Sequence, residues 1–379
     1  MTVFDPSEMR APSGLGKVLH FHWSILLLLL ATAAIGFGML FSVAGGSLDP
    51  WARAQMIRFG AGLAVMFVVA MIDIRYWRGL SVLAYLGALA LLVAVELFGT
   101  TGMGARRWID LGVLRLQPSE VMKIALVMAL ARYYAWLEPE RVSRPLWVAG
   151  PVLMTLVPMA LVLAQPDLGT ALLLGLGAAV VMFLAGVSLW YFLSASLAGA
   201  GAVYTVFASR GTSWQLLRDY QYRRIETFLD PSTDPLGAGY HITQSTIAMG
   251  SGGLTGRGFM QGTQSRLNFL PEKHTDFIFT TLAEEFGFVG ALTLLVLYTL
   301  IIVLAFASVL TNRDRFGALL TGGIAATFFL YFAVNMAMVM GLAPVVGVPL
   351  PLVSYGGSAM LVLLAAFGLL QSAHIHKPR

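Results

Sequence analysis

The charged residues best suited to chemistry lie where polar loops meet long apolar segments. The run Leu270–Phe279 brings Glu272, Lys273, His274 and Asp276 to the start of one such segment. A carboxylate at the edge of a low-dielectric layer can act as a general base, because desolvation raises its pKa while neighbouring cations lower it. Asp276 is therefore the candidate catalytic residue. The same spacing also allows Asp276 to be only the N-cap of the next helix.

A second pair of ionisable residues follows the motif Gln117-Pro118-Ser119. Pro118 suits the first turn of a helix, so we expect a helix to begin here. Glu120 and Lys123 are three residues apart and would share one face of that helix. Ionisable groups near the end of a membrane helix are costly and usually functional. Both are candidate substrate-binding residues; the alternative is an ion pair that only orients the helix.

Composition decides in which class of protein these residues work. Of the 379 residues, 58% are hydrophobic and only 11% are charged. Soluble domains contain about a quarter charged residues, so this chain has too few to cover a surface in water. The absence of cysteine excludes disulfides, thiolate metal sites and a cysteine nucleophile. The net charge of +5 suits contact with membrane lipids, and no nucleic acid is expected as a partner.

Long apolar runs predict about ten transmembrane helices. The expected fold class is therefore an all-α integral membrane protein, in which residues 1–379 form a single polytopic membrane domain. The first run follows a polar N-terminal segment and is long enough to span, so it would act as a retained signal anchor. The expected spans are His22–Ser42, Phe59–Ile72, Gly79–Phe98, Val121–Leu137, Leu146–Leu163, Gly169–Gly186, Val187–Ser209, Phe277–Leu310, Ala318–Met340 and Ser358–Ser372.

Basic residues in short loops orient these helices. Arg10 and Lys17 predict a cytoplasmic N-terminus, and ten spans would return the C-terminus to the same side. Residues 210–276, between the seventh and eighth spans, would then form a large periplasmic loop. This loop is short and rich in glycine, so we expect it to lie against the outer ends of the helices instead of folding alone.

Two outer segments carry more basic residues than the positive-inside rule allows. Long loops cross the membrane whatever their charge, so the short segment 100–119, with Arg106 and Arg107, is the stronger exception. Basic side chains on the outer face could hold an anion. Arg106, Arg107 and Lys273 are candidates for that role, although each could equally pair with a local acid such as Asp110.

Three further stretches predict structural features. Pro166 should end one helix, and Asp167 should cap the next. The stretch Gly250–Gly258 fits neither a phosphate-binding loop nor a dinucleotide fingerprint, so it predicts a flexible loop able to approach a substrate. Glu284 and Glu285 would lie inside the apolar layer and need partners, which favours a structural network.

The segment Pro344–Ser358 interrupts an apolar region with prolines and glycines. Broken backbone at membrane depth is tolerated only where it is buried in protein or lines a cavity. This segment, which contains Ser354, should therefore line a polar cleft near the outer face. No histidine pair has the spacing of metal ligands, so a protein-held metal is not expected.

Six motifs occur together, and as an ordered set they resemble the SEDS family (shape, elongation, division and sporulation). The likeness covers nearly the whole chain and is closer to the RodA branch than to the FtsW branch. The residues before His274 and the segment Gly262–Ser265 carry that distinction. The six motifs are Arg107–Gly112, Gln117–Glu120, Gln165–Thr170, Asp234–His241, His274–Phe279 and Ser354–Ser358.

The resemblance implies a ten-helix fold and a peptidoglycan glycosyltransferase that polymerises lipid II during cell elongation. The reaction would occur on the periplasmic face of the bacterial inner membrane, with a class B penicillin-binding protein as partner. The family's essential aspartate corresponds to Asp276, and its acid and lysine of the fourth helix correspond to Glu120 and Lys123. His274 and Ser354 complete the expected substrate-binding set.

The chemistry expected from this resemblance is an inverting single displacement. Asp276 would take the proton of the acceptor's 4-hydroxyl group. Arg106, Arg107, Lys123 or Lys273 would neutralise the leaving pyrophosphate, which a divalent cation such as Mg²⁺ or Mn²⁺ could assist. No organic cofactor is expected. The alternatives are a flippase or transporter for lipid-linked precursors and a non-enzymatic scaffold for the penicillin-binding protein.

Overall fold

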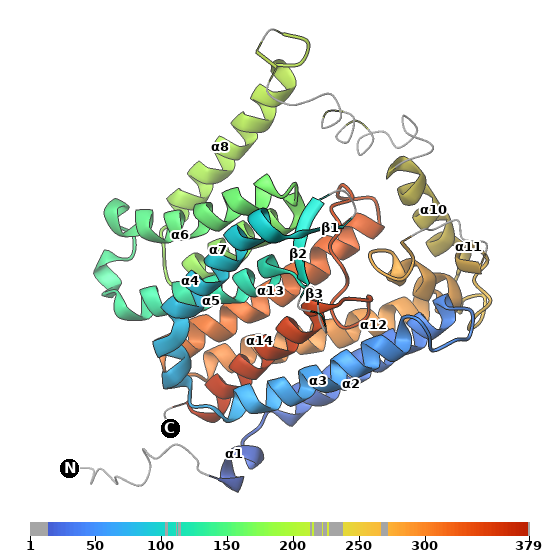
Figure 1. Ribbon diagram of the computed structural model, residues 1–379, viewed down its shortest axis with the longest axis horizontal. Coiled ribbons are helices and arrows are strands. Elements are labelled where there is room, and N and C mark those ends of the chain that lie inside the picture. The colour runs from blue at the N-terminus through green and yellow to red at the C-terminus, as the bar shows by residue number, and fades with distance from the viewer. Residues whose placement is uncertain are drawn as a thin grey trace.

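Helices make up nearly all the regular structure of the chain (Figure 1). The computed structural model describes residues 14–102, 105–110, 112, 115–212, 214–215, 222, 226, 238–266 and 272–377. The helices are α1 (Leu15–Leu19), α2 (Trp23–Val43), α3 (Ala52–Met71), α4 (Ile74–Phe98), α5 (Pro118–Trp136), α6 (Pro145–Ala164), α7 (Leu168–Leu184), α8 (Leu189–Ala208), α10 (Ala238–Ser251), α11 (Thr263–Arg266), α12 (Ile278–Leu310), α13 (Arg315–Val339) and α14 (Ser358–Ile375). A 3₁₀ turn, η2 (Pro139–Arg141), follows α5.

Within the described residues, eight helices are long and apolar enough to cross a membrane: α2, α3, α4, α6, α8, α12, α13 and α14. The protein is therefore a multi-pass membrane protein. Two further predicted spans also contain helices. The apolar helix α7 has 17 residues, and α5 is less apolar because it contains Glu120, Lys123 and Arg132. The total of ten spans stays a prediction.

Several predicted spans were too short, including the third, which was expected to begin at Gly79 although α4 begins at Ile74. The second span was expected at Phe59–Ile72, but α3 begins at Ala52. Arg53, Gln55 and Arg58 lower the hydropathy there without breaking the helix. The last span was expected to end at Ser372, but α14 continues to Ile375. Local polarity therefore shortened the predicted helices, because polar side chains can occupy a helix whose backbone hydrogen bonds are intact.

Small residues allow the central helices to approach closely. In α13, a Cβ atom at Gly323 would lie 2.4 Å from Val127 of α5 and 2.7 Å from Val181 of α7. Helices in lipid gain little from the hydrophobic effect, so close packing of this kind holds them together. The outlying helix is α8, which projects from the others in Figure 1 and has no buried residue.

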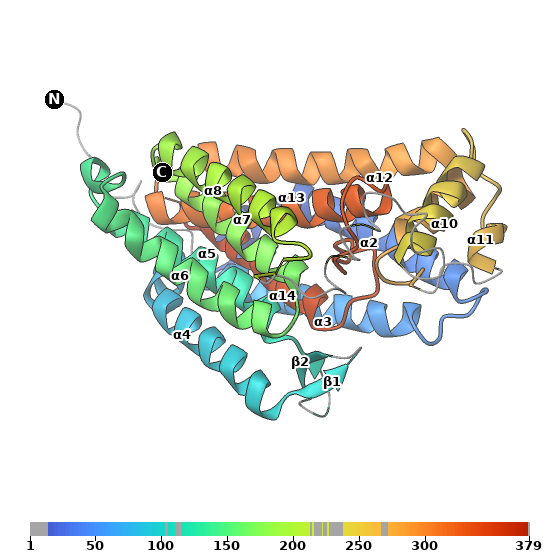
Figure 2. The same ribbon diagram turned by 90° about the horizontal axis from the view of Figure 1, so that it is seen from above.

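A small antiparallel sheet joins α4 to α5, in strand order β1-β2-β3. The strands are β1 (Thr100–Gly102), β2 (Ala105–Asp110) and β3 (Arg115–Leu116), and Figure 2 shows β1 and β2 at the end of α4. The prediction of an all-α fold therefore needs this addition. Because side chains alternate along a strand, β2 directs Arg106 and Arg107 to opposite faces.

The glycine-rich stretch packs on a break in α12. Gly287 has φ 63° and ψ −158°, which interrupts the helix. The amides of Phe288 and Val289 donate to the carbonyls of Gly253 and Leu254, at 2.9 and 3.1 Å. Backbone groups freed at a helix break in a membrane protein must find partners of this kind. The stretch therefore has a packing role here, in place of the free loop expected from its sequence.

The segment between α13 and α14 has the irregular backbone predicted for residues 344–358. Residues 342–357 contain no helix or strand, yet Val348, Leu350 and Val353 are buried. The segment passes close to α2, because a Cβ atom at Gly36 would lie 2.7 Å from the Cα atom of Val353. On the predicted outer side, α10 packs against α12 and α13, as expected for part of the large loop.

Candidate functional site

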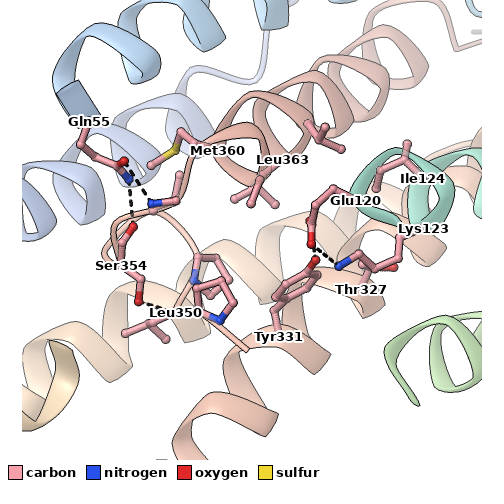
Figure 3. Close-up of a pocket in the computed structure, with 16 residues that line it drawn as sticks. Gln55, Glu120, Lys123, Ile124, Thr327, Tyr331, Leu350, Ser354, Met360 and Leu363 are labelled. Carbon is pink, nitrogen blue, oxygen red and sulfur yellow. Dashed lines mark hydrogen bonds and ion pairs between the residues drawn. The ribbon is translucent and has the colours of Figure 1, made fainter. Parts of the chain in front are cut away.

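A cavity lies where α3, α5, α13 and α14 meet the irregular segment 349–356 (Figure 3). Glu120, Lys123 and Tyr331 face one side of it, and Gln55 and Ser354 face the other. Apart from Thr327, the remaining lining is apolar, so the few polar groups determine which part of a ligand the cavity can hold. The broken segment therefore lines a cavity, as predicted, but the wall of this cavity is mostly apolar, so the prediction of a polar cleft was wrong in that respect.

Glu120 and Lys123 form a buried ion pair at the start of α5. The helix begins at Pro118 as predicted, and the exposed fractions of the two residues are 7% and 4%. Lys123 Nζ lies 2.7 Å from Glu120 Oε1, and the Tyr331 hydroxyl donates to Glu120 Oε2 at 2.6 Å. Both oxygens of Glu120 are therefore occupied, while Lys123, with three N–H donors, can still bind an anion.

Ser354 connects this cavity to the turn that carries Asp276. Its hydroxyl donates to the carbonyl of Thr275 at 2.6 Å and accepts from the amide of Leu350 at 2.8 Å. Gln55 of α3 donates to the carbonyl of Ser354 at 2.9 Å. The predicted substrate-binding serine thus uses its hydroxyl on the backbone, and its role in this structure is to position the turn.

Asp276 lies in the turn 272–277, whose backbone is held from two elements. Asn335 of α13 donates to the carbonyls of both Asp276 and Val348, at 3.0 and 2.7 Å. The carboxylate itself has no hydrogen bond or ion pair among the described residues. Burial, and then the nearby charge of Glu272, raise the pKa of Asp276 to about 6.

The alternative reading of Asp276 as an N-cap is wrong. Helix α12 begins at Ile278, its N-cap residue is Phe277, and no side chain caps it. The Asp276 Oδ2 atom instead lies near Gly347, where an added Cβ would be 3.7 Å away. A partly exposed carboxylate with free oxygens and a raised pKa is suited to accept a proton near neutral pH.

Aromatic rings surround the neighbouring candidate His274. Its ring stacks on Trp51 with centroids 4.5 Å apart, and Tyr355 lies 6.2 Å away. Burial lowers the pKa of His274, against a smaller opposing effect of Glu272. Burial also lowers the pKa of Lys273. The guanidinium of Arg58 lies 4.9 Å from the centroid of the Tyr355 ring, a cation–π distance.

The structure separates Arg106 and Arg107 from this cavity. Arg107 donates to the carbonyls of Gln165, at 3.0 Å, and Pro166. It thereby holds the turn before α7, where Asp167 caps the helix by accepting from the amide of Thr170, as predicted. Arg106 is exposed on β2. Arg106 therefore stays available to an external anion, whereas Arg107 is engaged within the protein.

Residues 22–379 match the family of FtsW, RodA and SpoVE, described as a cell cycle protein. The chain is 44% identical to peptidoglycan glycosyltransferase MrdB of Escherichia coli strain K12 over 360 residues, which are 94% of both chains. It is 36% identical to a probable peptidoglycan glycosyltransferase FtsW of Escherichia coli O6:H1, covering 92% of this chain and 84% of that one.

This chain belongs to the SEDS family. It superposes with a TM-score of 0.80 on a chain from a peptidoglycan synthase complex, at 34% identity, covering 93% and 97% of the two chains. It also superposes on rod shape determining protein RodA of Thermus thermophilus, with a TM-score of 0.70, 30% identity and coverage of 95% and 98%. The prediction of a RodA-like SEDS protein is confirmed.

Several residues around this cavity and the Asp276 turn were not singled out from the sequence. Tyr331 and Gln55 look like ordinary residues of their helices, and only packing brings them to the cavity. Asn335 did carry a signal, because an amide in an otherwise apolar span needs a partner. Among the described residues, no group of three or more His, Cys, Asp or Glu side chains could hold a metal ion.

Proposed function

We propose that this protein is a peptidoglycan glycosyltransferase that polymerises lipid II into glycan strands during cell elongation. The observation that carries the proposal is the Asp276 carboxylate. It has no partner among the described residues, its pKa is about 6, and its turn is fixed by Asn335 and Ser354. The relatives named peptidoglycan glycosyltransferase support the reaction type.

The proposed reaction is a single inverting displacement. Asp276 takes the proton of the acceptor's 4-hydroxyl as its oxygen bonds to the anomeric carbon of the donor. The bond from that carbon to the pyrophosphate breaks at the same time, and the undecaprenyl pyrophosphate leaves. Glu120 is a poor alternative base, because Lys123 and Tyr331 already occupy its two oxygens. Free lone pairs and a pKa near the operating pH favour Asp276.

Basic side chains would stabilise the negative charge of the leaving pyrophosphate. Lys123 lines the cavity, Lys273 is three residues before Asp276, and Arg106 is exposed. Arg107 is the weakest of these candidates, because it is bonded to two carbonyls. Mg²⁺ or Mn²⁺ would accompany the pyrophosphate as part of the substrate complex, and an organic cofactor has no role in this reaction.

The proposed setting is the bacterial inner membrane, with the site facing the periplasm and a class B penicillin-binding protein as partner. The apolar outer surfaces of the helices suit lipid II, because its tails could stay in the bilayer while the head groups react. A structural neighbour from a peptidoglycan synthase complex supports the partner. The excess of basic residues in the predicted outer loops supports a site for a charged head group.

The test is polymerisation of labelled lipid II by purified protein in detergent, with a class B partner and a divalent cation. Wild type and Asp276→Asn run side by side, and the exposed loop variant Asp49→Asn is the control. Long glycan from wild type and control alone supports the proposal. Folded protein that makes no glycan would move the function to the flippase or scaffold alternatives, which lipid II translocation in vesicles then separates.

A further inference from the structure

A second acidic pair, Glu284 and Glu285, lies in α12 outside the cavity described above. The two residues are 0% and 2% exposed. Within the part of the chain that the structure describes, neither forms an ion pair. The guanidinium of Arg257 reaches Glu284 only through the hydroxyl of Thr263, to which it donates at 3.2 Å. Two carboxyl groups buried without a direct cation partner are costly, so the surroundings of this pair need an explanation.

Each glutamate has one oxygen with partners and one without. Glu285 Oε1 accepts from the hydroxyl of Ser42 at the end of α2, and the backbone of Met260 also donates a hydrogen bond to the Glu285 carboxylate. Glu284 Oε1 accepts from the hydroxyl of Thr263 and from the backbone N–H of Gln264, both at 3.0 Å. The Oε2 atoms of both residues are buried and have no hydrogen-bond partner among the described residues. Buried polar atoms are nearly always satisfied, so something is expected to bind there.

Two neutral oxygen atoms nearby are also buried without a hydrogen-bond partner among the described residues. They are the hydroxyl of Thr281, which is 1% exposed, and the amide oxygen of Gln264. Thr281 precedes the glutamates by one helical turn. At about 100° per residue, Glu284 and Glu285 lie about 60° to one side of Thr281 and about 40° to the other. The Thr281 hydroxyl therefore leaves α12 between the two acids.

Gly262 lies against both glutamates. A Cβ atom there would be 2.8 Å from Glu284 Oε2 and 3.3 Å from Glu285 Cγ. The loop backbone at Gly262 therefore packs directly on both glutamate side chains, and a side chain at position 262 would collide with Glu284 Oε2. The neighbours Gln261 and Thr263 are exposed, which leaves a short path from solvent.

We propose that Glu284, Glu285, Thr281 and Gln264 bind a hard divalent cation, Ca²⁺ or Mg²⁺. Carboxylate, amide and hydroxyl oxygens are the ligands that such cations prefer, and water can complete the coordination. Two carboxylates neutralise the ion, and all four bare oxygens gain a partner. The bound ion fastens the loop 252–264 to α12. This site is separate from any cation that accompanies a pyrophosphate, and it does not depend on the proposed function.

The decisive variant is Thr281→Val, because it removes a hydroxyl that has no partner within the described protein. Without a cation this change leaves stability equal or higher, since an unsatisfied buried group is lost. With the cation, loss of a ligand weakens binding about tenfold or more. Thr299→Val is the matched control on the same helix, because the Thr299 hydroxyl bonds to its own helix, at the carbonyl of Leu295.

The measurement is the melting temperature of chelator-treated protein, titrated with Ca²⁺ and separately with Mg²⁺ to about 10 mM, well above the weakest extracellular calcium sites. Isothermal calorimetry gives the Kd of the same samples. Wild type and Thr299→Val should be stabilised alike, Thr281→Val should bind at least about tenfold more weakly, and Glu284→Gln with Glu285→Gln should not bind.

Folded wild type that binds neither ion would overturn the site, leaving water or protonated carboxyls at these oxygens. Unchanged binding by Thr281→Val would overturn the four-oxygen set, even where the double glutamine variant fails to fold. The ion with the lower Kd identifies the ligand.

Discussion

Glu120 and Asp276 are both carboxylates beside a helix start, yet their surroundings differ. Glu120 has a lysine on one oxygen and a tyrosine hydroxyl on the other. Asp276 has no partner for its side chain among the described residues, although its backbone carbonyl is held by Asn335. A buried acid with partners on both oxygens organises its neighbours, whereas an acid without partners and with a raised pKa is available for proton transfer.

The largest effect should come from Asp276→Asn. The amide cannot accept the proton, and general-base catalysis contributes about 10²–10⁴-fold. We expect polymerisation of lipid II to fall by at least about 10²-fold, measured as glycan length and amount, while Asp49→Asn retains activity. Near-normal glycan synthesis by Asp276→Asn would remove the functional distinction between the two carboxylates.

Single substitutions in the Glu120–Lys123 pair should mainly affect stability. Lys123→Met leaves a buried charge uncompensated, which costs about 3–5 kcal/mol. Pairing it with Glu120→Gln should restore part of that loss, because no buried charge remains. Chemical denaturation of wild type, the two single variants and the double variant in one detergent gives the coupling free energy between Glu120 and Lys123. Equal losses in the double and single variants would contradict the ion pair.

The pH dependence of activity and of stability should follow the titration of Asp276. With a pKa of about 6, Asp276 is increasingly protonated below pH 6, so kcat/KM should fall about tenfold per pH unit there. A raised pKa also means that the folded state holds this proton more tightly than the unfolded chain. The contribution of Asp276 to stability therefore declines as pH rises from about 4 to 6.

Asp276→Asn should remove the loss of stability that Asp276 causes as the pH rises from about 4 to 6. The variant should have a higher melting temperature than wild type at pH 7, even though it is inactive. A lower melting temperature at pH 7 would contradict the burial of an unpaired carboxylate.

Asn335→Ala should have an intermediate effect on the turn. It leaves the carbonyls of Asp276 and Val348 without their donor, which costs about 1–3 kcal/mol. Because Asn335 acts by positioning, kcat should fall more than KM rises, and the apparent pKa of activity should move. If the pH profile of activity were unchanged in Asn335→Ala, Asn335 would contribute only to the stability of the fold and would not position Asp276.

The smallest effects should separate Arg106 from Arg107. Arg107→Gln loses two bonds to carbonyls, so stability should fall by about 1–3 kcal/mol. Arg106→Gln should leave stability within about 0.5 kcal/mol, as for exposed positions in general, and weaken lipid II binding at low salt. Thermal melts and binding at two salt concentrations measure both effects.

Local patterns in the sequence determined the helices and several of their ends. Apolar runs predicted each long helix, because only hydrogen-bonded helices satisfy the backbone in lipid. Pro118 and Asp167 marked the starts of α5 and α7 correctly, since proline at the first turn and aspartate caps act within one turn. The same locality placed Glu120 and Lys123 together.

Tertiary structure alone decided which chemical role each residue can take. Tyr331 reaches Glu120 across 211 positions of the chain, and Ser354 reaches Thr275 across 79. The turn held by these contacts and by Asn335 keeps Asp276 from capping α12, the role that its sequence position equally allowed. Spacing predicts partners within one helix face, but a carboxylate's partners, burial and pKa depend on segments that meet only when the helices pack.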